Sequence, residues 1–82
     1  MDKSKILIDI LNKIEGFPQK DKKNVDDLIE HNEWGVALEI ICSVILQEKI
    51  MVSKRVYDEI INVGNEMKME PCLWKGISNL LK

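Results

Sequence analysis

Apolar residues recur at helical spacing in about five successive stretches of the chain, separated by short breaks. The first stretch, residues 4–15, places its apolar side chains three and four residues apart and ends before Gly16 and Pro18, a common helix stop. This pattern predicts an amphipathic helix with Ser4 as its N-cap residue. Its apolar face consists of Leu7, Ile10, Leu11 and Ile14.

The second stretch, residues 21–31, has a narrow apolar stripe made of Val25, Leu28 and Ile29. Asn32 follows it, and asparagine tolerates the left-handed backbone conformation that closes many helices. The third stretch, residues 33–48, is apolar over most of its circumference. A helix of that kind is surrounded by other elements, so we expect it at the centre of the fold. Its one clear polar strip is Glu39, Ser43 and Gln47.

The fourth stretch begins at Ser53, a good N-cap residue, and keeps its helical period as far as Met67. Gly64 falls inside its apolar stripe, where it either lets another backbone approach closely or ends the helix early. Because Met67 stays in phase, we favour the close approach. The fifth stretch starts at Pro71, and its expected buried residues include Trp74 and Ile77. No window alternates with a period of two residues. The sequence therefore predicts an all-α fold: a compact bundle of about five short helices with a central hydrophobic third helix.

A chain of 82 residues corresponds to one domain, here residues 1–82. This length excludes dinucleotide-binding folds and barrels. No apolar stretch approaches the length of a membrane span, and the N-terminal residues lack the pattern of a signal peptide. Cys42 and Cys72 are too few for a disulfide framework, so we expect reduced, partly buried thiols. Together these features predict a cytoplasmic protein.

Residue sets that carry catalysis or bind cofactors are weak or missing in this sequence. No glycine-rich phosphate loop, nucleophile motif or cysteine–histidine pair occurs. His31 is the single histidine, and we interpret it as a solvated residue at a helix end rather than as an acid–base catalyst. We therefore expect no enzyme activity, no metal site and no cofactor.

The net charge of −2 conceals an uneven distribution. Residues 1–23 sum to +2, whereas residues 24–39 contain five carboxylates and no lysine or arginine. Negative charge near a helix start is stabilising, which accounts for Glu33 better than for the earlier residues. The alternative is an acidic surface that binds a basic partner. The candidate partner-binding residues are Asp26, Asp27, Glu30, Glu33 and Glu39.

A DNA-binding helix-turn-helix has to be considered as an alternative, because small all-α domains are often of this type. Its recognition helix would present several basic or amide side chains to the major groove. The outward positions of the fourth stretch carry two positive and three negative charges, which a phosphate backbone would repel. The set is Lys54, Arg55, Asp58, Glu59, Asn62 and Glu66. We therefore expect no direct contact with nucleic acid.

Residues 28–39, LIEHNEWGVALE, resemble bacterial immunity proteins of the MafI type. The pattern in those proteins is an apolar pair, a polar break, a glutamate with a bulky residue, and then Ala-Leu-Glu opening a long helix. The likeness covers about residues 25–69, and its least generic parts are Glu33, residues 37–39 and the spacing to Tyr57.

The resemblance implies a non-catalytic partner of a polymorphic or contact-dependent growth-inhibition toxin. Such a protein binds the C-terminal domain of its cognate toxin, often a nuclease, and neutralises it in the cytoplasm. Aromatic residues are typical anchors of an interface, and Trp74 and Tyr57 are candidates here, although both also fit the core. The runner-up is a small helical adaptor or regulatory module unrelated to toxins.

Overall fold

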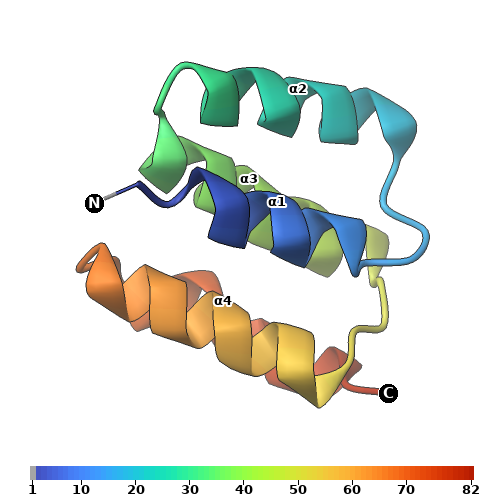
Figure 1. The fold of residues 1–82 in the computed structure, drawn as a ribbon. Helices are drawn as coiled ribbons and strands as arrows, with labels where there is room; N and C mark the ends of the chain where they lie inside the picture. Colours follow the sequence, from blue (N-terminus) through green and yellow to red (C-terminus); the bar gives the residue numbers. More distant parts are fainter. Residues whose placement is uncertain (1) are drawn as a thin grey trace.

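Four α-helices are followed by a C-terminal 3₁₀ segment in two pieces in the computed structural model, which describes residues 2–82 (Figure 1). The elements are α1 (Ser4–Asn12), α2 (Gln19–Glu30), α3 (Trp34–Glu48), α4 (Lys54–Glu66), η1 (Pro71–Leu73) and η2 (Lys75–Leu80). They pack to a radius of gyration of 11.3 Å. Within the described residues there is no strand, which confirms the predicted all-α fold class.

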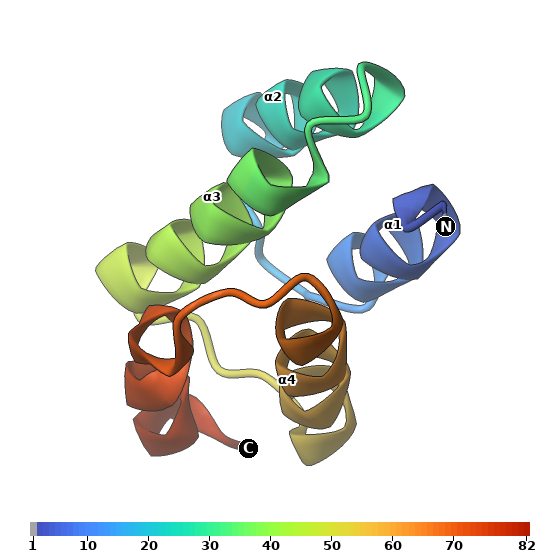
Figure 2. The ribbon, with the colours of Figure 1, turned by 90° about the vertical axis from the view of Figure 1, so that its left-hand side faces the viewer.

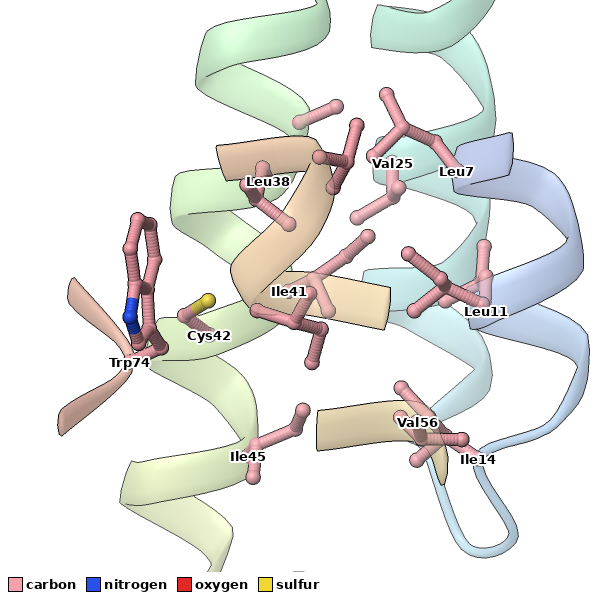
Figure 3. Packing of buried hydrophobic residues seen from close by; sticks show 14 of the residues in the cluster. Leu7, Leu11, Ile14, Val25, Leu38, Ile41, Cys42, Ile45, Val56 and Trp74 are labelled. Atoms are coloured by element: carbon pink, nitrogen blue, oxygen red, sulfur yellow. The ribbon is translucent and has the colours of Figure 1, made fainter. Parts of the chain in front are cut away.

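The central position predicted for the third helix is confirmed. Helix α3 contacts α1, α2, α4 and both pieces of the 3₁₀ segment. In the view of Figure 2, α2 lies above α3, α1 lies beside it, and α4 and the C-terminal segment lie below. Buried side chains from these helices and from the C-terminal segment meet in one core, as the labelled residues of Figure 3 illustrate.

Two helix starts differ from the prediction. Ser4 is the first residue of α1 rather than its N-cap, because the Asp2 carboxylate accepts a hydrogen bond from the Ser4 backbone N–H at 2.7 Å. The Ser4 hydroxyl instead accepts from the indole N–H of Trp34 at 3.2 Å, which ties the starts of α1 and α3 together. Helix α2 starts earlier than predicted, directly after Pro18.

Two further helix boundaries agree with the sequence pattern, and the end of α1 does not. Asn32 has the left-handed conformation expected of it, with φ of +61°. Ser53 caps α4, since its hydroxyl accepts from the Val56 N–H at 3.2 Å. Helix α1 ends at Asn12 rather than near residue 15, and Gly16 follows in the turn with φ of +84°.

The fifth predicted helix is 3₁₀ rather than α-helical. Residues three apart align on one face of a 3₁₀ helix, and this places Trp74, Ile77 and Leu80 toward the core. A short parallel bridge then fixes the chain end. The Val52 N–H donates to the Leu80 carbonyl oxygen, and the Lys82 N–H donates to the Val52 carbonyl oxygen, both at 2.9 Å.

The role predicted for Gly64 is only half right, because the group that approaches it is a side chain. A Cβ atom at this position would lie 2.2 Å from Cζ3 of Trp74. The indole ring therefore packs against the helix where a side chain is missing. With 4% of its surface exposed, Trp74 belongs to the core, and it is excluded as an interface anchor.

Candidate partner-binding surface

Three of the five predicted acidic residues lie in the last two turns of α2. Asp26, Asp27 and Glu30 are all exposed. The same helix opens with lysines at 20, 22 and 23 and with the half-buried Asp21, so its net charge runs from positive at the N-terminal end to negative at the C-terminal end. The acidic surface of α2 is thus confined to its C-terminal half.

This charge order opposes the helix macrodipole. Anionic side chains stabilise a helix near its N-terminus and destabilise it near its C-terminus, by about 0.3–1 kcal/mol each. The last turn of α2 contains no basic residue. Helix-end electrostatics therefore does not explain Glu30 in the last turn. Asp26 and Asp27 lie farther from the helix end and follow Lys22 and Lys23 by four residues, a spacing at which opposite charges stabilise a helix.

The remaining two predicted residues belong to α3 and its start. Glu33 occupies the N-cap position of α3 without a side-chain hydrogen bond to the helix. Glu39 lies on the solvent-facing side, together with Ser43 and Gln47, as the polar strip predicts. All five predicted residues are exposed, and they come from the outward sides of α2 and α3 and from the turn between them. We call them the acidic set.

No ion pair involves the acidic set in the part of the chain that the structure describes. The ion pairs lie elsewhere, on α1, on α4 and at the C-terminal end. Two of them link the α1 region to α4: Lys3 Nζ lies 2.7 Å from Glu66 Oε1, and Lys13 Nζ lies 3.0 Å from Glu59 Oε2. The carboxylates of the hairpin formed by α2 and α3 are left to the solvent.

His31 lies at the end of α2 and is exposed, as the sequence predicts. Its Nδ1 is 2.8 Å from the Asp27 carbonyl oxygen, so this nitrogen carries the proton and donates. The same carbonyl oxygen also accepts from the His31 backbone N–H at 3.1 Å, so the ring adds a second hydrogen bond at the end of the helix. The side chain therefore has a structural task within the acidic region.

Val36 is exposed, although the third stretch, which contains it, is predicted to be buried on every side except the strip of Glu39, Ser43 and Gln47. The apolar circumference of the third stretch included it, but it is 43% exposed. A signal was present in the sequence: at 100° per residue, Val36 is turned about 140° from Ile41, the centre of the buried side. Ile40, one turn after Val36, is half-buried.

The two cysteines differ in environment. Cys42 is buried on α3, and this burial raises the pKa of its thiol to about 12. Cys72 is exposed on η1, so the predicted partial burial is wrong for this residue. Among residues 2–82 there is no pocket and no group of three potential metal ligands. No helix in the same range is long and apolar enough to cross a membrane.

The chain was compared with protein-family models, with curated proteins and with solved structures, and none of the three comparisons finds a match.

Proposed function

We propose that this chain is an immunity protein that binds a cognate bacterial toxin domain and neutralises it without catalysis. The proposal builds on the resemblance of residues 28–39 to MafI-type immunity proteins. The observation that carries it is the acidic set itself, whose five carboxylates are exposed and take part in no ion pair of the described residues, with Glu30 in the last turn of α2, where negative charge opposes the macrodipole. Side chains that cost stability and stay exposed are expected where a partner needs them.

A nuclease is the toxin class that fits this surface best. An enzyme that grips RNA or DNA is basic where the phosphates bind. Residues 24–48 carry six carboxylates and no lysine or arginine, so this stretch presents only negative charge. Complementary fields of this kind steer encounter and can raise association rates to ~10⁸–10⁹ M⁻¹s⁻¹ at low salt.

The size of the molecule allows such an interface. Its accessible surface is 5190 Å². A standard protein–protein interface takes about 800 Å² from each partner. The hairpin of α2 and α3 could therefore supply one complete contact surface while α1, α4 and the C-terminal segment remain outside it.

The deciding experiment is co-expression with the toxin domain encoded next to the gene of this chain. We expect cells to survive only when both proteins are made, and the purified pair to form a stable stoichiometric complex. Loss of viability despite soluble expression of this chain would contradict the proposal. A stable complex with a non-toxic cellular protein, identified by mass spectrometry, would instead support the adaptor alternative.

A further inference from the structure

The solvent-facing side of α3 carries an exposed aliphatic residue between two carboxylates. Val36 has Glu33 three residues before it and Glu39 three residues after it, and both carboxylates are exposed. Residues three and four apart on a helix are surface neighbours. The half-buried Ile40 extends the apolar area by one turn. The result is an apolar spot inside an acidic frame about 9 Å long along the helix axis.

The other exposed aliphatic residues of the described chain have different neighbours. Ile6 and Ile8 lie on α1, three residues after Lys3 and Lys5 respectively. Met51 stands between Lys49 and Lys54 in the sequence. Among the exposed large apolar residues within 2–82, Val36 alone belongs to the stretch 24–48 that lacks lysine and arginine. A partner that reaches Val36 therefore meets negative charge around it.

We propose that this side of α3 is the docking surface for a basic, amphipathic helical segment of the toxin domain. An aliphatic side chain of that segment packs on Val36 and Ile40, and a lysine or arginine one turn away on each side meets Glu33 and Glu39. That the partner is a toxin domain rests on the proposed function. That this side of α3 binds a basic segment is argued separately, from the exposure of Val36 and the charges of Glu33 and Glu39. An apolar centre with a charged rim is the usual anatomy of an interface.

The charges of the frame argue against other occupants. A second copy of the chain, docked through the same side, would bring Glu33 and Glu39 of each copy against carboxylates of the other. Nucleic acid and anionic lipid would be repelled for the same reason. A purely apolar segment would remove water from the Glu33 and Glu39 carboxylates without supplying a cation to pair with them, and burying unpaired charges costs binding free energy.

The first test measures binding of a catalytically inactive form of the neighbouring toxin domain to Val36→Ser. We expect dissociation about tenfold faster, since the substitution removes the anchor, with little change in the association rate. Ile8→Ser is the matched control, because Ile8 is 39% exposed on α1, and it should bind like the parent chain. The double variant Glu33→Gln/Glu39→Gln should mainly slow association at low salt. Unchanged dissociation of Val36→Ser would overturn the proposed surface.

The second test separates the surface from the identity of the toxin. A synthetic lysine–leucine helix of about 15 residues, long enough to be helical, is titrated into the isotope-labelled protein. We expect the largest amide shift changes around Val36 and Ile40, and weaker binding to Val36→Ser. Shifts centred on α2, or spread evenly over all carboxylates, would refute the docking surface. A parent chain that fails to bind the toxin domain in the first test would refute the proposed function instead.

Discussion

The four ion pairs of the described residues involve the two ends of α1, helix α4, Glu15 and the C-terminal Lys82, whereas the carboxylates on the outward sides of α2 and α3 take part in none. On the paired side, lysines of the α1 region meet glutamates of α4, and Lys82 meets Glu15. On the unpaired side, the acidic set takes part in no ion pair of the described chain, and Glu30 lies in the last turn of α2, where negative charge opposes the macrodipole. The ion pairs between elements therefore lie away from the acidic set, whose five carboxylates stay exposed.

The two sides also differ in the space around a helical glycine. Gly64 on α4 is covered by the Trp74 ring, so its missing side chain is part of the packing. Gly35 on α3 has nothing within 4 Å of the position where a Cβ would stand. Space around the first turn of α3 is therefore open, whereas space around the end of α4 is filled.

The largest expected effect comes from Gly64→Ala on the packed side. The new methyl group would collide with the indole ring of Trp74, and the C-terminal segment would have to move. We expect a loss of about 3 kcal/mol in the free energy of unfolding. That corresponds to a melting temperature lower by about 10–20 °C.

Gly35→Ala is the matched control on the open side. It should be neutral or stabilising by up to about 1 kcal/mol, because alanine favours the helix and meets no atom there. Thermal unfolding followed by circular dichroism compares the two variants. Equal melting temperatures would show that the packing of the two sides does not differ as described.

An intermediate effect is expected when two members of the acidic set are reversed by Asp27→Lys/Glu30→Lys. Association with the toxin domain should slow about tenfold at low salt and lose most of its salt dependence. The fold should not suffer, because a lysine at position 30 agrees with the macrodipole of α2 and follows Asp26 at the favourable spacing of four residues.

Glu59→Lys provides the contrast, since Glu59 pairs with Lys13 on the other side of the molecule. This variant should lower the melting temperature while association with the toxin domain keeps its rate. Rates from stopped-flow mixing at several salt concentrations check both variants. Unchanged association rates for the reversed acidic pair would rule out steering by α2.

The smallest effect concerns pH and the pair of Glu15 with Lys82. The hydrogen bond from Lys82 lowers the pKa of the Glu15 carboxyl below its ordinary value. A lowered pKa in the folded state contributes stability above the unfolded pKa, and this contribution is lost as the pH falls through the folded pKa. Glu15→Gln should therefore melt slightly below the parent chain at pH 7 and equally with it in acid.

The control for this prediction repeats Glu15→Gln in a chain that already carries Lys82→Met. At neutral pH, the Lys82→Met chain should then melt at the same temperature with and without Glu15→Gln, because the Lys82 ammonium that donates to Glu15 is absent from both. A difference between the parent chain and the Glu15→Gln variant that persists in acid would assign the effect to something other than this ion pair.

Sequence periodicity by itself determined the helices and their order. The three-and-four spacing of apolar residues placed α1 to α4 within a few residues of their ends, and the nearly uniform apolarity of α3 predicted its central position. Both succeed because each helix buries its own stripe, and a stripe is a local property of the chain. The exposure of the acidic set follows from the same helical spacing, since those carboxylates lie outside the buried apolar stripes.

Tertiary structure alone decided which charges are paired, which group covers Gly64 and what form the last segment takes. The partners of Lys3 and Lys13 come from α4, more than forty residues away in sequence, and no local pattern encodes such a pairing. The C-terminal segment is 3₁₀, with Trp74 against Gly64 and Ile77 in the core. These features depend on distances between elements, which exist only once the helices have packed.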